Sequence, residues 1–276
     1  MHDVFFFTDI HGMSNLYHKI IDYCITKDPE CTIIFGGDAC DRGPNGYHIM
    51  KDLLSRPNVI YLKGNHEDIF VKAAYEIKNH FDFKNISPDE VRRVLESTLV
   101  FDYRYSNIQT SIYNGGIDTL VDWVMDGMPM NFVKQIEALP LTFSWEQYDF
   151  CHAAGVYRIF REVSECEHYH KLIDEYLSDS IMWNRSALDY GWETDRIAVF
   201  GHTPVTYLLQ DLEATGNKFK PYKYIGKFDE KMTGEKIDMD TGACFTGYAY
   251  VLNCLTGKYQ GYYYDKESGK IQILIE

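Results

Sequence analysis

The sequence predicts an α/β fold, and two features of the chain support that class. Up to residue 65, short apolar segments alternate with segments whose apolar residues recur at helical spacing. Strands that are joined by crossover helices form parallel sheets. Residues 247–265 and 270–276 instead resemble consecutive strands with Thr-Gly and Ser-Gly turns, which is typical of an antiparallel meander. We therefore expect parallel pairing early in the chain and antiparallel pairing late.

The first elements follow one another in strand–helix order. Strands are expected at residues 3–9, 31–38 and 58–67, and helices at residues 14–25 and 46–55. Functional residues of parallel sheets gather at the carboxyl ends of the strands. Asp9, Asp38 and Asn65 fall at these ends, so we expect them to lie near one another.

The middle of the chain has a different pattern. A helical pattern runs from residue 67 to 138, and a Ser-Pro pair at 87–88 followed by acidic residues marks a helix start. Strands are expected again at residues 148–155 and 196–204. The segment 205–238 is polar and rich in glycine and lysine, so we expect an irregular excursion there. No linker separates the two halves, and residues 1–276 are expected to form a single domain.

Charge and cysteine content narrow the functional classes. The chain has 41 acidic and 27 basic residues, which gives a net charge of −14. This excess disfavours attraction to nucleic acid or anionic membranes, so neither is expected as a partner. The seven cysteines form no CxxC motif, which fits reduced thiols in the cytoplasm. The N-terminal apolar run is too short for a signal peptide, and no run reaches the ~20 apolar residues of a spanning helix. We expect a soluble cytoplasmic protein.

Five polar segments each follow an expected strand. One of them, GGDACDRGP at residues 36–44, has two carboxylates and a guanidinium where a turn needs only glycine and one aspartate. Together the segments carry Asp9 and His11; Asp38, Asp41 and Arg42; Asn65 and His66; His152; and His202. Taken singly, each has an ordinary explanation, such as a capped turn, a surface ion pair or a core histidine. Their recurrence at five strand ends indicates a metal site.

The residue types indicate which metals this site would take. Carboxylate, imidazole and amide oxygen suit manganese, iron or zinc, whereas calcium prefers oxygen ligands alone. Two ions about 3.5–4 Å apart can clamp a phosphoryl group and generate hydroxide near neutral pH. An aspartate between them can bridge both ions. We therefore interpret Asp38 as the bridging ligand and Asp41 as a residue with another role.

The order of the motifs resembles a known family. GDxxDRG, GNHE, HAxG and GHT follow one another as in the phosphoprotein phosphatase family of binuclear metallophosphoesterases. LPL at 139–141, WNR at 183–185, NGG at 114–116 and DTGA at 240–243 resemble its bacterial and phage branch. That branch includes lambda-type Ser/Thr phosphatases and symmetrical diadenosine polyphosphate hydrolases. The resemblance covers residues 1–255 and implies a calcineurin-like sandwich of two mixed β-sheets flanked by helices.

The resemblance also implies a role for each site residue. It assigns metal one to Asp9, His11 and Asp38; metal two to Asp38, Asn65, His152 and His202; phosphoryl contacts to Arg42 and Arg185; and proton donation to His66, oriented by Asp41. Two divalent ions are expected, with manganese first and iron, zinc or nickel as alternatives. The nucleophile would be a hydroxide between the ions. The phosphoryl role of Arg185 is inferred from the WNR motif alone, and a loop ion pair is the other explanation for this residue.

Three functions remain open on the sequence. The leading one is a dimetal phosphomonoesterase of the Ser/Thr protein phosphatase type, and the alternative is hydrolysis of diadenosine polyphosphates or nucleotides. The substrate would accordingly be a phosphorylated protein or a small phosphorylated molecule. The non-enzymatic alternative is an inactive metallophosphoesterase scaffold. Such a scaffold is expected to lose ligands or the acid, whereas every such position is filled here. Thr8 departs from the glycine that usually precedes the first aspartate of the family.

Overall fold

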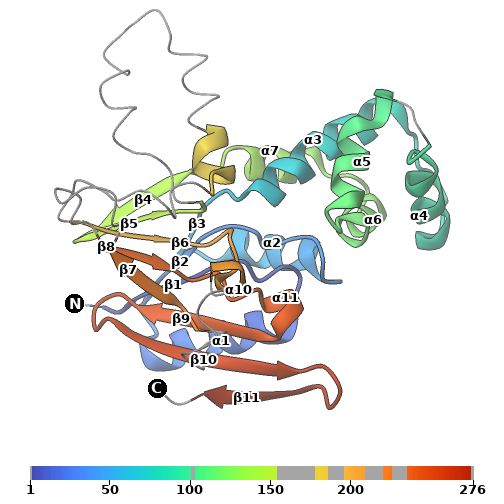
Figure 1. The fold of residues 1–276 in the computed structure, drawn as a ribbon. Coiled ribbons are helices and arrows are strands. Elements are labelled where there is room, and N and C mark those ends of the chain that lie inside the picture. The colour runs from blue at the N-terminus through green and yellow to red at the C-terminus, as the bar shows by residue number, and fades with distance from the viewer. Residues whose placement is uncertain are drawn as a thin grey trace, which may run out of the picture.

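The computed structural model describes residues 2–100, 103–153, 178–185, 196–208, 220–225 and 235–274. Two mixed β-sheets pack against each other, and helices cover the other face of one of them (Figure 1). A further group of helices extends away from the sheets on one side. This arrangement confirms the predicted α/β sandwich of two mixed sheets flanked by helices.

The first sheet contains the parallel strands expected from the start of the chain. Its order is β11-β10-β9-β1-β2-β3. These strands are β1 (Val4–Phe7), β2 (Thr32–Phe35), β3 (Val59–Tyr61), β9 (Tyr248–Asn253), β10 (Lys258–Asp265) and β11 (Lys270–Leu274). β1, β2 and β3 pair in parallel through the crossover helices α1 (Ser14–Lys27) and α2 (Gly46–Ser55). β9, β10 and β11 form the predicted antiparallel meander, which joins β1 through β9.

The second sheet corrects one expectation. Its order is β4-β5-β6-β8-β7, formed by β4 (Thr142–Trp145), β5 (Tyr148–Cys151), β6 (Ile197–Phe200), β7 (Tyr222–Ile225) and β8 (Glu235–Asp238). β8 pairs with both β6 and β7, and α10 (Val205–Leu208) follows β6. The prediction of an irregular excursion over 205–238 is therefore wrong for these elements. The polar residues of this segment suggested an exposed loop, but Lys236 and Asp238, on either side of Ile237 in β8, are fully buried. Residues 209–219 and 226–234 lie outside the described part of the chain.

The middle of the chain is helical, as predicted. It contains α3 (Asn65–His80), α4 (Pro88–Ser97), the 3₁₀ turn η1 (Tyr103–Tyr105), α5 (Ser106–Tyr113), α6 (Ile117–Met125) and α7 (Met130–Glu137). Ser87 caps α4: its hydroxyl accepts from the Glu90 backbone N–H, and the Glu90 carboxylate accepts from the Ser87 backbone N–H. A last short helix, α11 (Ala243–Thr246), connects β8 to β9.

The core explains why the first strand is a continuous apolar run. Phe5 and Phe7 point into the cluster that contains α1 and α2, whereas Phe6 points into the cluster between the two sheets. Phe6 stacks there on Phe150 of β5 at 5.2 Å between ring centroids. A strand that is covered on both faces needs apolar side chains at successive positions. Burial on both faces therefore fixes β1 in the centre of the molecule.

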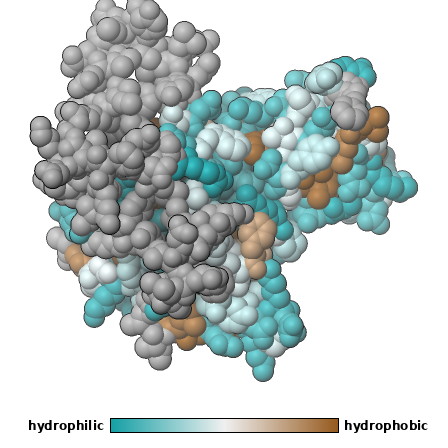
Figure 2. Space-filling model, in the orientation of Figure 1, coloured by the Kyte–Doolittle hydropathy of each residue, from teal (hydrophilic) through white to brown (hydrophobic). Residues whose placement is uncertain are grey.

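The outer surface of the helical group differs from this core. Figure 2 shows that surface as largely hydrophilic, with only a few hydrophobic positions. Val100 and Tyr103 are among the exposed apolar residues there. In the described residues, no helix combines the length and the apolar character needed to cross a membrane.

Candidate metal centre

The strand order brings the five predicted segments together. Asp9 and His11 follow β1, Asp38 follows β2, Asn65 begins α3 just after β3, His152 follows β5, and His202 follows β6. β1, β2 and β3 are parallel, so their carboxyl ends meet at one edge of the first sheet. The two sheets meet at this edge, because the His202 backbone N–H donates to Asp9 and a His152 ring nitrogen contacts the Gly36 carbonyl.

The backbone of these loops is strained. Nine described non-glycine residues have a positive φ, and six of them are predicted site residues: Asp9, His11, Asp38, Asp41, Arg42 and His202. Residues other than glycine rarely adopt this conformation, and each instance costs on the order of 1–3 kcal/mol. Such strain persists only where the surrounding structure enforces it, and it clusters at functional sites. The loops are therefore shaped for the side chains that they present.

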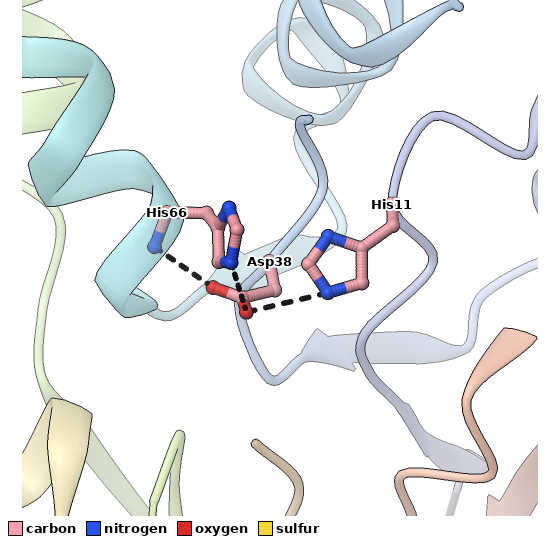
Figure 3. A group of neighbouring side chains, drawn as sticks. All are labelled: His11, Asp38 and His66. Carbon is pink, nitrogen blue, oxygen red and sulfur yellow. Dashed lines mark hydrogen bonds and ion pairs between the residues drawn. The ribbon is translucent and has the colours of Figure 1, made fainter. Parts of the chain in front are cut away.

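Asp38 lies at the centre of the arrangement. Figure 3 shows its carboxylate between the imidazoles of His11 and His66. Asp38 Oδ2 lies 3.5 Å from His11 Nε2, and Asp38 Oδ1 accepts from the His66 backbone N–H at 3.0 Å. Oδ1 also lies 3.3 Å from His152 Nε2. The two oxygens thus face different sets of donors, as a bridging ligand requires.

Near Asp38 Oδ2, the His11 imidazole has a ring nitrogen that is free of a proton and could bind a cation. His11 Nδ1 lies 2.8 Å from the carbonyl oxygen of Cys40, which can only accept a hydrogen bond. The proton of neutral His11 therefore resides on Nδ1, and Nε2 presents a lone pair toward Asp38. Arg42 Nη1 donates to this Nε2 at 2.7 Å.

Around Asp38 Oδ1, the ring nitrogens of two histidines converge on one amide oxygen. His152 Nδ1 is 2.9 Å from the Gly36 carbonyl, and His202 Nε2 is 3.2 Å from the Trp183 carbonyl. Each histidine therefore turns its other ring nitrogen toward Asn65 Oδ1, at 2.9 Å in both cases. Without a metal, a proton on His152 can lie between these atoms; with both histidines neutral, as metal ligands are, their lone pairs and the amide oxygen repel one another unless another cation lies between them. This donor set fits a divalent metal ion.

The pKa values of the site residues are shifted because these residues are buried close to one another. Burial lowers the pKa of His152, but the Asp38 carboxylate outweighs it and raises the pKa to about 10. Burial and the neighbouring His152 lower the pKa of His202 to about 3. Burial raises the pKa of Asp9 to about 6, even though His152 opposes this. Buried carboxylates require nearby positive charge, which divalent cations in the two donor sets would supply.

Asp9 is buried at the same edge, but its oxygens have other partners. Both Oδ atoms accept from the His202 backbone N–H at 3.1 Å, and Oδ2 also accepts from the Thr8 hydroxyl at 2.7 Å. In the described residues, two groups of acidic and histidine side chains are close enough to hold an ion: His11, Asp38 and His66; and Asp38, His152 and His202. Neither group contains Asp9. Its role as a ligand of metal one stays a prediction.

His66 is held by Asp41, as the sequence indicated. His66 Nδ1 lies 2.8 Å from Asp41 Oδ2, and both side chains are buried. Burial lowers the pKa of His66, but the Asp38 and Asp41 carboxylates outweigh it, so the pKa is raised above the ordinary value. The other Asp41 oxygen, Oδ1, is buried without a partner in the described structure and lies beside Gly116. The ring edge that carries Nε2 is directed toward Arg42, which donates to it at 2.9 Å.

The sequence matches one known protein family over most of its length. Residues 2–223 match the calcineurin-like phosphoesterase family. The chain belongs to that family. Members of this family typically bind two divalent metals, and the two donor groups that share Asp38 agree with this. The protein is a metal-dependent phosphoester hydrolase.

One solved structure shares the fold, and two others are similar at lower TM-scores. A proposed diadenosine tetraphosphatase is 14% identical, with a TM-score of 0.51, and the alignment covers 94% of this chain and 92% of that chain. A cold-active protein tyrosine phosphatase of Shewanella is 15% identical, with a TM-score of 0.46 and coverage of 100% and 81%. A Ser/Thr phosphatase of Saccharomyces cerevisiae, similar to human PP5, is 12% identical, with a TM-score of 0.42 and coverage of 99% and 80%. Among curated protein sequences, none matches the chain.

Two arginines flank the centre of this phosphoesterase. Arg42 is exposed, yet both of its Nη atoms contact ring nitrogens of buried histidines. Arg185 is also exposed, and its Nη1 donates to Thr203 Oγ1 at 2.9 Å and to the His202 carbonyl at 3.3 Å. Each guanidinium therefore lies beside one of the donor groups and is open to solvent. The ion pair proposed as an alternative for Arg185 is not among its described contacts.

The sequence did not single out Glu67, which organises the phosphoesterase site. Its buried carboxylate accepts four hydrogen bonds: from the backbone N–H groups of Asp38, Ala39 and Gly64, and from the Tyr61 hydroxyl. Their lengths are between 2.7 and 2.8 Å. Burial raises the pKa of Glu67, yet three of its partners are backbone N–H groups that can only donate, which favours the ionised carboxylate. The signal was the acidic residue directly after the Asn-His pair.

Proposed function

We propose that this phosphoesterase is a dimetal phosphomonoesterase of the Ser/Thr protein phosphatase type. The observation that carries the proposal is the position of Asp38 between two donor groups, with the His66–Asp41 pair beside one of them. Hydrolysis of a monoester needs charge to stabilise the phosphoryl oxygens and an acid for the leaving oxygen. The arrangement offers residues for both tasks.

The residues that would hold the ions follow from the two donor groups. Metal one is assigned to Asp9, His11 and Asp38, and metal two to Asp38, Asn65, His152 and His202. When bound, two such ions activate water near neutral pH and stabilise the phosphoryl oxygens. Manganese is the first choice, with iron, zinc and nickel as alternatives.

His66 is proposed as the proton donor. Asp41 accepts the Nδ1–H of His66, which fixes the ring. Nε2 accepts from Arg42 in this structure and would carry the transferable proton once Arg42 turns to the phosphate. His66 is buried, and its Nε2 contacts the exposed Arg42, so the acid lies next to a group that a substrate can reach. Protonation of the leaving oxygen matters most for alkyl esters such as phosphoserine, because alkoxides are poor leaving groups.

Arg42 and Arg185 are proposed to bind the phosphoryl oxygens. Each arginine lies beside a different one of the two groups of possible metal ligands. A guanidinium presents two parallel N–H groups that match the geometry of a phosphate. Contact with phosphate would require Arg42 to release the histidine nitrogens that it now contacts, since the first metal would use the lone pair of His11. We expect this arginine to change partners when metal and substrate bind.

The domain organisation, the cellular location and the substrates are proposed from the sequence. We propose that residues 1–276 act as one domain in the cytoplasm, on phosphorylated proteins or small phosphorylated molecules. The six cysteines in the described residues are all free, which is consistent with a reducing compartment. Diadenosine polyphosphates and other nucleotides are the alternative substrates.

Hydrolysis of 4-nitrophenyl phosphate by the manganese-loaded protein tests the proposal. We expect turnover that Asp38→Asn abolishes together with binding of at least one ion. A substrate panel of phosphopeptides, nucleotides and dinucleoside polyphosphates then distinguishes the substrate classes. If the folded, metal-loaded protein hydrolyses none of them, the inactive scaffold is the better description.

A second measurement decides between Asp9 and His66 as ligands. Titration calorimetry with manganese should give two sites for the wild type and for His66→Asn, and fewer for Asp9→Asn. The reverse result would assign His66 to metal one and remove it from proton donation.

A further inference from the structure

An exposed aromatic ring lies against one arginine of the proposed phosphate site. Phe245 of α11 is 64% exposed, although phenylalanine is usually buried. The Arg42 guanidinium carbon lies 5.5 Å from the centre of this ring, which is within cation–π range. Single exposed apolar residues are common on protein surfaces, but this one touches a residue of the proposed phosphate site.

The ring is presented by a rigid turn. Gly242 and Gly247, at the two ends of α11, have φ values of 69° and 79°, which residues with a side chain rarely adopt. The Phe245 backbone N–H donates to the Gly242 carbonyl at 2.8 Å, and the Thr246 hydroxyl lies 2.9 Å from the Thr241 carbonyl. Lys266 Nζ donates to the Cys244 carbonyl at 2.7 Å. These contacts hold the backbone that carries the ring, while the ring itself stays exposed, as expected of a contact whose backbone is preorganised.

The position of the ring relates it to the leaving group. Arg42 Nη2 contacts His66 Nε2 at 2.9 Å, so the same guanidinium contacts both Phe245 and the proposed acid. In a hydrolysis that protonates the leaving oxygen from His66, the alcohol portion of the ester departs on this side. The exposed part of Phe245 is then available to that alcohol rather than to the phosphoryl group.

We propose that Phe245 determines substrate specificity by contacting an aromatic ring carried by the leaving alcohol. This inference rests on the proposed phosphomonoesterase function and adds a substrate class to phosphoserine and phosphothreonine. The added class consists of phosphate monoesters whose alcohol bears a planar ring, either a benzene ring or a nucleobase. Water supplies the oxygen to phosphorus, the P–O bond to the alcohol breaks, and His66 protonates the departing oxygen. Aromatic pairs of this kind add to the affinity that area burial provides.

Two matched pairs of substrates test the inference, because the members of each pair have similar leaving oxygens. Benzyl phosphate is compared with cyclohexylmethyl phosphate, and adenosine 5′-monophosphate with ribose 5-phosphate. We expect the metal-loaded wild type to favour the aromatic member of one pair in kcat/KM by about two- to tenfold. The pair that shows the preference identifies the ring as benzene or nucleobase.

Variants of Phe245 assign that preference to the ring. Phe245→Ala and Phe245→Leu should reduce the ratio to about one and leave the rate for the non-aromatic member nearly unchanged, whereas Phe245→Trp should keep the preference. Tyr103→Ala is the matched control, because Tyr103 is 92% exposed on η1 and should not affect the ratio.

Two results would overturn the inference while leaving the proposed function intact. One is an equal ratio in wild type and Phe245→Ala. The other is an equal fall for both members of a pair, which would mean that Phe245 only positions Arg42. Failure of the proposed function looks different, since the wild type would then hydrolyse none of the four esters.

Discussion

Replacement of Glu67 by glutamine should destabilise the protein strongly, although the change removes no volume. The carboxylate accepts two hydrogen bonds at each oxygen, from Ala39 and Tyr61 at Oε1 and from Asp38 and Gly64 at Oε2. In Glu67→Gln, an NH₂ group replaces one oxygen. At the Oε2 position it faces two backbone N–H groups, and at the Oε1 position it faces one, because the Tyr61 hydroxyl can accept from it. One or two hydrogen bonds to a charged group are lost, at about 1.5–3 kcal/mol each, so we expect a loss of about 1.5–6 kcal/mol. That is a large part of the total stability of a typical domain.

Guanidinium unfolding of the metal-free protein, followed by circular dichroism, measures this loss. Chelation is essential, because bound metal would stabilise both proteins and obscure the comparison. Tyr61→Phe removes a single donor and should cost about 1.5–3 kcal/mol. Glu96→Gln, at an exposed position of α4, is the control and should change the free energy of unfolding by less than about 0.5 kcal/mol.

The Glu67 variant should also bind manganese more weakly. The carboxylate holds the backbone N–H groups of Asp38 and Ala39, and therefore the position of the bridging ligand. A Glu67→Gln protein whose free energy of unfolding lies within about 1 kcal/mol of wild type would refute this account of the hydrogen bonds.

Three further predictions concern other residues. His66→Asn should slow hydrolysis of alkyl phosphates by about 10²–10⁴-fold and affect 4-nitrophenyl phosphate less, and an unchanged alkyl rate in steady-state kinetics would exclude His66 as the acid. Gly116→Ala should impair the same step and cost about 1–3 kcal/mol in thermal unfolding, because its Cβ would lie 2.3 Å from Ser111 Oγ and 2.9 Å from Asp41 Oδ1; normal alkyl-phosphate kinetics would contradict this. Asp52→Asn should lower the melting temperature at pH 7. Burial raises the pKa of Asp52, but hydrogen bonds from Arg56 and Tyr17 outweigh it, so the pKa is lowered. Its stabilising contribution is present above the unfolded-state pKa of about 4 and disappears as the pH falls through the folded-state value. The difference in melting temperature should therefore shrink below about pH 4, and a constant difference would refute the pKa assignment.

Local patterns in the sequence determined much of this fold. The apolar runs of β1 and β2 and the helical spacing of α1 predicted the parallel start of the first sheet, because periodicity reports which faces are buried. The turn glycines predicted the meander, since Gly257 and Gly269 have positive φ between its strands. The same reasoning missed β8, where burial of Lys236 and Asp238 depends on neighbouring strands rather than on the local pattern.

The sequence by itself determined which residue types end the strands, and so indicated a metal-dependent phosphoesterase. Only the tertiary structure decided which atoms meet. His202 donates to an aspartate that is 193 positions away, Glu67 accepts from three loop N–H groups, and Arg42 lies over the Phe245 ring. Hydrogen bonds and ring contacts of this kind act over a few ångströms. Their partners are therefore set by how the two sheets pack, which no local pattern of residues encodes.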